Sequence, residues 1–147
     1  MVMRIPFQTS MRAAAMSLLS DYASGSSIQL QMYPGRPMSI YPPTAFPEAV
    51  NESTVLTGPK MRQRTVQVVI VAIWGLFDSA EAVAQKDVFM DGFLDHVTDN
   101  AHEADPATLI SMVSSEDLPN YVPDWMPPEK QRAYYATQIT VEGFANG

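Results

Sequence analysis

The residues that come closest to metal-binding chemistry are acidic side chains of the segment 78–99 and a few neighbours. Aspartates recur every four residues there, at Asp87, Asp91, Asp95 and Asp99. The same region contains His96, His102 and Glu103. On a helix the four aspartates form one row, and hard divalent cations prefer oxygen ligands. The spacing matches no recognised metal-binding loop, so a solvated or inter-subunit face is the favoured interpretation, and we expect no metal and no cofactor.

Side chains suited to catalysis are scarce. His96 and His102 are the only groups that titrate near neutral pH, and the Gly-x-Ser-x-Gly motif of serine hydrolases is absent. The chain has no cysteine, which excludes thiol catalysis, disulfides and thiolate metal sites. It also lacks a Walker loop and a dinucleotide fingerprint. We therefore expect no catalytic residue and no enzyme, and a small enzymatic or ligand-binding module remains the least favoured alternative.

The charge of the chain is divided unevenly along its length. Its 147 residues are enough for one domain, 1–147, with a net charge of −7. Up to Trp74 there are six Lys/Arg against three Asp/Glu, and beyond it three against thirteen. A net acidic protein does not favour nucleic-acid binding, which needs phosphate neutralisation. Opposite charge in the two halves could instead let copies associate head to tail, although a solvated acidic helix face explains the charge more simply.

The first half of the chain predicts one helix and several strands. Apolar residues at Met11, Ala15 and Leu18 share one face of a helix over 10–24, which Gly25 ends. Alternation predicts a strand over 28–32, and the Pro-Gly-Arg-Pro sequence at 34–37 predicts a turn. Residues 38–41 could pair back as a hairpin. A further strand is expected over 49–56, followed by a polar, basic loop over 57–64.

The second half begins with the strongest strand prediction, 65–74, ended by Gly75. Asp78, with Glu81 three residues on, predicts a capping box and a helix over 78–99. A loop over 100–106, a short strand over 108–114, a long proline-rich loop over 115–131 and a closing strand over 133–144 follow. We expect an α+β fold, with a mixed, mostly antiparallel sheet of about five strands packed by two main helices. The sequence contains no run of about 18 apolar residues, so a membrane span is not expected. We expect a protein that is cytosolic or assembled in the cytosol.

Aromatic side chains beside prolines are the remaining theme. Such residues give rigid contact surfaces at low entropic cost, although about half of the aromatic residues are expected to belong to the core. Arg36 lies at a turn tip, where it could pair with an acid of a neighbouring copy or be an ordinary exposed arginine. The expected subunit or partner interface consists of Tyr33, Arg36, Tyr41, Phe46, Asp117, Tyr121 and Trp125.

Seven segments of the chain carry a resemblance to a known family. They include Tyr-Pro-Gly-Arg-Pro at 33–37, Tyr-Pro-Pro-Thr-Ala-Phe at 41–46 and the segment 117–132. The others are 12–19, 65–71, 77–83 and 134–143. Together these segments resemble the tail terminator family of long-tailed bacteriophages. The resemblance covers nearly the whole chain, and its motifs are structural rather than chemical.

The resemblance implies a structural virion protein of the phage tail or neck, assembled in the host cytoplasm. In that family a ring, usually of six copies, caps the tail tube, stops its growth and joins it to the head-side connector. DNA passes through the lumen without sequence-specific binding, and the aspartate row could face that lumen or face outward. The alternative is another head–tail connector or tail-completion protein. Its partners would be copies of itself, the tail-tube protein and the connector protein, with no membrane.

Overall fold

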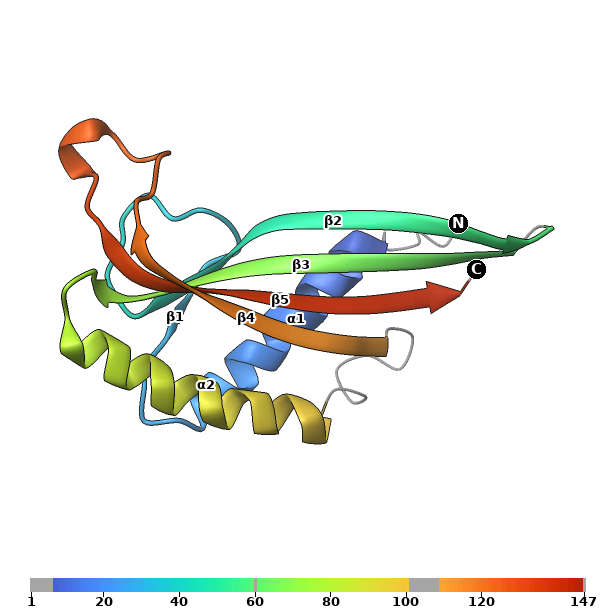
Figure 1. The fold of residues 1–147 in the computed structure, drawn as a ribbon, viewed down its shortest axis with the longest axis horizontal. Helices are drawn as coiled ribbons and strands as arrows, with labels where there is room; N and C mark the ends of the chain where they lie inside the picture. The colour runs from blue at the N-terminus through green and yellow to red at the C-terminus, as the bar shows by residue number, and fades with distance from the viewer. Residues whose placement is uncertain (1–6, 60, 101–108, 147) are drawn as a thin grey trace, which may run out of the picture.

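The computed structural model describes residues 7–59, 61–100 and 109–146, which form two α-helices and a long sheet (Figure 1). The first part contains α1 (Phe7–Ser24), β1 (Gln31–Met32), β2 (Thr44–Gly58) and β3 (Met61–Leu76). The second contains α2 (Ala80–Asn100), β4 (Leu109–Tyr121), the short 3-10 helix η1 (Pro128–Lys130) and β5 (Tyr134–Asn146). The strand order is β1-β2-β3-β5-β4, with only β1 and β2 parallel. The expected fold class is confirmed.

Both helices cover the same face of the sheet. The even-numbered residues of β3 from Val66 to Trp74 point into a core with Met11 and Leu19 of α1 and Phe89 and Phe93 of α2. Val71 and Ile73 point to the opposite face, into a second, smaller cluster. The centre of β3 is therefore apolar on both faces, as its sequence predicts.

Tyr22 joins the two helices. Its ring lies 4.9 Å from that of Phe89, edge to face, and 5.8 Å from that of Phe93. The Tyr22 hydroxyl lies against the backbone of α2 at Gly92, where a Cβ would collide with it. Glycine weakens a helix interior, so this close approach explains its presence in the middle of α2.

The predicted basic loop over 57–64 is wrong: the segment is the turn and arms of a hairpin. β2 continues to Gly58, and β3 begins at Met61, which pairs with it. Gln63 lies opposite Val55, and Arg64 lies opposite Thr54. These arms extend past the helices (Figure 1), so they need no apolar face and carry no alternating pattern.

Two other predictions in the first half are wrong in part. The strand over 28–32 is reduced to Gln31–Met32, and residues 38–41 form no hairpin. The nearby prolines, Pro34 and Pro37 before and Pro42 and Pro43 after, cannot donate ladder hydrogen bonds. Ile28 and Leu30 are still half-buried against the core, so the alternation reports burial rather than pairing.

In the second half, the long loop predicted over 115–131 is partly wrong because β4 continues to Tyr121. Residues 114–117 are exposed, as on an edge strand with little to bury. The helix cap is Ser79 rather than Asp78: its Oγ accepts a hydrogen bond from the Ala82 amide at 3.1 Å. Gly75 does not end β3 but follows an irregularity in its pairing with β5, and α2 packs close to it through Ala82. The expected loop over 100–106 lies outside the described residues apart from Asn100.

Candidate assembly interface

The two lateral edges of the sheet are bare over long stretches. β1 pairs only with Thr44 and Ala45, so beyond Ala45 the outer edge of β2 has no partner strand among the described residues. The outer edge of β4 also has none among them. Unpaired edges present rows of backbone donors and acceptors that can pair with another chain. Pro47 and Pro119 limit pairing only near one end of each strand.

Most of the expected interface aromatics meet inside the chain, in the second cluster. Trp125 packs edge to face on Phe46, with ring centroids 5.4 Å apart, and its Nε1 donates to the Pro37 carbonyl at 3.1 Å. Tyr33 and Tyr121 pack at the same cluster. These contacts join the loop before β2 to the loop after β4. Of the aromatic residues expected at an interface, Tyr41 is the strongly exposed one.

Arg36 also contacts its own chain. Its Nη2 lies 2.7 Å from Glu48 Oε1, and its guanidinium lies 5.0 Å from the centroid of the Trp125 ring. The hydrogen bond to Glu48 raises the pKa of Arg36. Glu48 falls at an irregularity in the pairing of β2 with β3, and such a bulge re-aims side chains. Its other oxygen, Oε2, is buried without a hydrogen-bond partner among the described residues.

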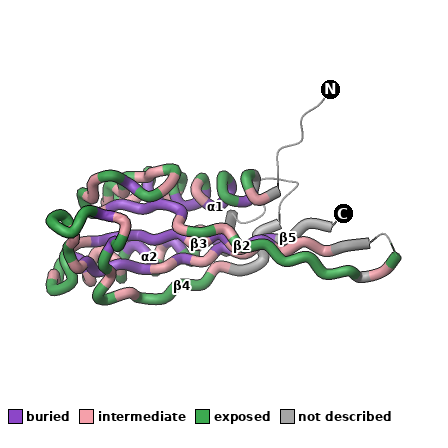
Figure 2. The backbone as a smooth tube through the Cα atoms, turned by 90° about the horizontal axis from the view of Figure 1, so that it is seen from above, coloured by how far each residue is buried: buried purple, intermediate pink, exposed green. Residues whose placement is uncertain are grey.

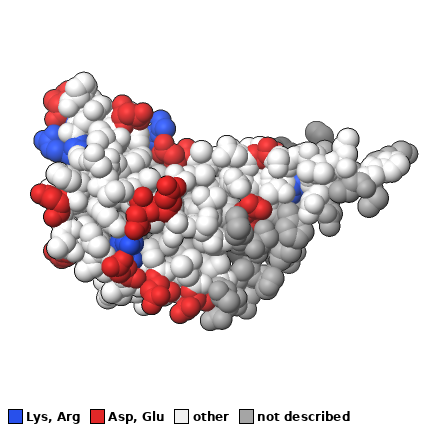
Figure 3. Space-filling model, viewed as in Figure 1, with Lys and Arg blue, Asp and Glu red and all other residues white. Residues whose placement is uncertain are grey.

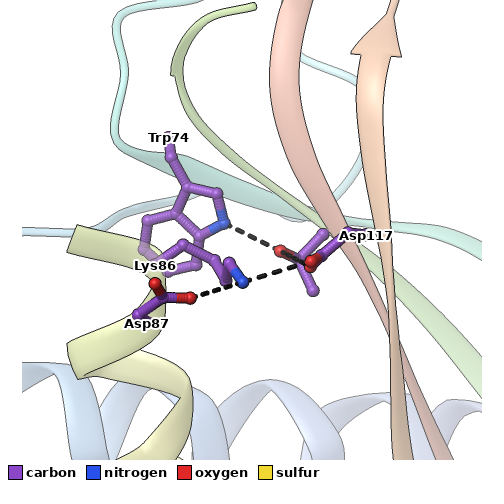
Figure 4. A network of polar contacts seen from close by, with 5 residues as sticks. Trp74, Lys86, Asp87 and Asp117 are labelled. Atoms are coloured by element: carbon purple, nitrogen blue, oxygen red, sulfur yellow. Dashed lines mark hydrogen bonds and ion pairs between the residues drawn. The ribbon is translucent and has the colours of Figure 1, made fainter. Parts of the chain in front are cut away.

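Asp117 belongs to a polar network that joins three strands to α2 (Figure 4). Trp74 Nε1 donates to Thr137 Oγ1 at 3.0 Å, and Thr137 Oγ1 donates to Asp117 Oδ1 at 3.4 Å. Lys86 Nζ lies 3.1 Å from Asp117 Oδ2 and 2.6 Å from Asp87 Oδ1. The Lys86 side chain is only 13% exposed, and its bonds to these two carboxylates raise its pKa. The network holds the edge strand β4 against α2.

The aspartate row lies on the solvent side of α2. Asp91 and Asp95 are exposed, while Asp87 pairs with Lys86. His96 is half-buried with its ring 5.4 Å from that of Tyr22. The side chain of Asp99 and the residues His102 and Glu103 lie outside the described part. Within the described part, no three acidic or histidine side chains come together as a metal site.

An open groove of about 510 Å³ runs beside α1. Arg12, Ala13, Met16 and Ser17 form its helical wall. The opposite wall consists of Met32, which ends β1, the next residue Tyr33, and Pro47 of β2. The lining is mostly apolar. The groove therefore lies between α1 and the start of the sheet at β1, and it reaches β2 only at Pro47.

Charge is distributed unevenly over the surface. On the face seen in Figure 3, carboxylates outnumber basic groups among the described residues. Glu116 and Asp117 of β4 and Asp87, Asp91 and Asp95 of α2 are all exposed. Within α1, β1, β2 and β3, three basic residues are balanced by three acidic ones, so the basic excess of the first 74 residues comes from Arg4, Arg36 and Lys60, outside these elements. In contrast, α2, β4 and β5 together contain eight acidic residues against Lys86 alone.

Sequence reasoning missed three participants for which signals existed. Proline inside a strand pattern often marks a bulge, so Pro47 could have indicated that Glu48 departs from the ladder. Lys86 is the one Lys or Arg of the acidic segment 78–99, which indicated that it would pair with carboxylates, as it does with Asp87 and Asp117. Met16 lies outside the row of buried residues on α1. A large apolar side chain at such a position was a signal for a second apolar surface on this helix, which is the groove.

Comparisons with known proteins add no assignment. A scan against protein-family models finds no match, and a search of curated proteins finds no significant relative. Neither described helix is long and apolar enough to cross a membrane.

Proposed function

We propose that this protein is a ring-forming structural protein of a phage tail, which caps the tail tube, stops its polymerisation and joins it to the head-side connector. The resemblance to tail terminators motivates the proposal. The observation that carries it is the pair of bare, oppositely directed edges of one long sheet.

The topology favours association of the two edges head to tail. β2 is antiparallel to β3, β3 to β5, and β5 to β4, so β2 and β4 run in opposite directions. When β4 of one copy meets β2 of the next with both sheets in the same orientation, the new pair is antiparallel. Such a heterologous contact makes a ring if its rotation closes.

One end of the sheet is suited to a second partner. Several large apolar side chains are exposed where β3 and β4 end and β2 and β5 begin: Met38, Tyr41, Leu76, Phe77 and Val122. Exposed apolar groups gathered in one region favour a protein contact. We assign this end to the tail tube or the connector. The net acidic chain would not hold DNA that passes through the ring.

The deciding experiment adds the purified protein to polymerising tail-tube protein and measures tube length by negative-stain microscopy. We expect short tubes with a ring at one end, and light scattering of the protein alone should give particles of about six copies at high concentration. Binding to the connector without an effect on tube length would favour another neck protein. A monomer at every concentration that leaves tube length unchanged would contradict the proposal.

A further inference from the structure

The α1 groove has no occupant within the described chain. Its helical wall presents Ala13 and Ser17 beside Met16, and small side chains let a second helix approach closely. An open apolar channel along a helix is the shape in which another amphipathic helix packs.

α2 lies on the same face of the sheet as α1 but toward β5 rather than β2, and its outer face is suited to the groove. Val88 is 68% exposed in the middle of the helix and contributes little to the chain's own core. Ala84, Asp91 and Asp95 are exposed around it. A large aliphatic side chain surrounded by carboxylates is typical of a surface whose centre is covered and whose rim stays charged.

Charge selects between the possible pairings of these surfaces. Arg12 is the only charged side chain among the described residues that line the groove, whereas the α2 face carries carboxylates. Contact between two copies of the groove would bring Arg12 near Arg12, and contact between two α2 faces would bring aspartates together. Only the pairing of groove with α2 face combines opposite charges.

The positions of the two surfaces fit the same arrangement. In Figure 1, β2, whose Pro47 forms part of the groove, runs along the top edge of the sheet, and α2 lies along the bottom. A head-to-tail contact joins opposite sides of successive copies. Pairing of β4 with the β2 edge of a neighbour would therefore bring α2 toward the groove of that neighbour.

We propose that the groove beside α1 receives the outer face of α2 from a second copy of this chain, with Val88 in the apolar channel and Asp91 near Arg12. The inference rests on the ring proposed above and specifies which surfaces form it. It places the aspartate row at the subunit contact rather than in the lumen.

Cysteine cross-linking tests the contact directly, because the chain has no cysteine of its own. Ser17→Cys and Val88→Cys change exposed positions on the two surfaces. We expect covalent dimers when the two variants are mixed and oxidised, and none from either variant alone. Glu129→Cys, exposed on η1, replaces Val88→Cys as the matched control and should give no dimer with Ser17→Cys.

Two results would overturn the inference in distinguishable ways. If light scattering shows oligomers but the mixture gives no dimer, or Ser17→Cys links to itself as well as in the mixture, the groove contact is wrong and the ring stands. If the wild-type chain stays monomeric and leaves tube length unchanged, the ring and the groove contact fail together.

Charge reversal gives an independent measurement. Arg12→Glu and Asp91→Arg should each weaken self-association about three- to tenfold, the range expected for an exposed charge pair turned repulsive. The double variant should recover most of the loss. Asp21→Arg, an exposed change on α1 outside the groove lining, is the control and should not show recovery with Arg12→Glu. A double variant as weak as the single variants would contradict the pairing of Arg12 with Asp91.

Discussion

The two ends of the sheet are built from the same antiparallel ladder but are covered very differently. One end, where β3 and β4 end and β2 and β5 begin, is here called the loop end. There the helices cover one face of the sheet, and the second cluster, with Phe46 and Trp125, covers the other. At the other end, here called the hairpin end, β2 and β3 are joined by their hairpin. Residues 51–56 of β2 are exposed there (Figure 2). Leu56 is 80% exposed there. Backbone pairing therefore does not distinguish the ends; side-chain cover does.

This difference in side-chain cover suggests that one part of the sheet stabilises the monomer and another part contacts neighbouring copies. Apolar burial dominates the free energy of folding, so the covered regions must supply most of the stability of the monomer. The hairpin end adds ladder hydrogen bonds but little burial, and long exposed edges are usually protected or paired. We therefore expect substitutions in the covered regions to unfold the chain and substitutions in the hairpin to change association.

The largest effect is expected from Phe93→Ala in the helix-covered core. Phe93 is fully buried against Tyr22 and Phe89, and removing a buried phenyl ring lowers the free energy of unfolding by about 3–5 kcal/mol. Urea unfolding followed by circular dichroism measures it. Asp95→Ala, an exposed change on the same helix, should stay within about 0.5 kcal/mol. A loss below about 1 kcal/mol for Phe93→Ala would mean that the helices are not the main cover of the sheet.

A smaller effect is expected from Trp125→Ala at the loop end. The indole is half-buried, so the loss should be about 2 kcal/mol, below the range for a fully buried aromatic residue. Both loops should then become sensitive to limited proteolysis. Trp125→Phe, which keeps a ring on Phe46 but loses the bond to Pro37, should cost about 1 kcal/mol. Unchanged stability with lost assembly would instead assign Trp125 to an interface.

These regions also differ in how well sequence predicts them. The helix-covered core was predictable because each element there buries one face, so that periodicity appears directly, as at Met11, Ala15 and Leu18. The hairpin over 57–64 and the second half of β4 were not, because their strands bury little and leave no alternating pattern. The sequence of these segments therefore suggested loops, and only the backbone pairing in the structure shows that they are strands.

The candidate site shows the same limit. Aromatic type and neighbouring prolines led to the prediction that Trp125, Phe46 and Tyr121 form an interface, but they could not indicate that the three side chains pack together within the chain. That choice depends on two loops separated by more than 80 residues, joined by the Trp125 to Pro37 hydrogen bond. A non-local contact of this kind leaves no local trace in the sequence.

Alkaline pH should lower the free energy of unfolding through Tyr121 at the loop end. Self-association through the hairpin end should not yet change at that pH. Burial and the nearby Glu48 carboxylate raise the pKa of Tyr121 above its usual value of 10.0. Because the folded-state pKa is the higher one, the stabilisation is complete below pH 10 and is lost as the pH rises further. Melting temperatures between pH 8 and 11 should fall above about pH 10, and Tyr121→Phe should reduce that slope. An identical slope in the variant would mean that other groups, such as Lys86 or Tyr135, cause the loss.

The smallest effect on stability, and the sharpest test of the comparison, is expected from Leu56→Ser. Because Leu56 is so exposed, the free energy of unfolding should change by no more than about 0.5 kcal/mol. If a neighbouring copy covers the hairpin, the same change removes about 1.5–3 kcal/mol of burial from the contact, a loss of more than about tenfold in self-association. Met38→Ser is the matched control, since Met38 is equally exposed at the loop end. It should leave the ring mass unchanged and weaken binding to the tail tube or connector. Equal effects of the two variants on ring mass would show that the two ends do not divide self-association and partner binding between them.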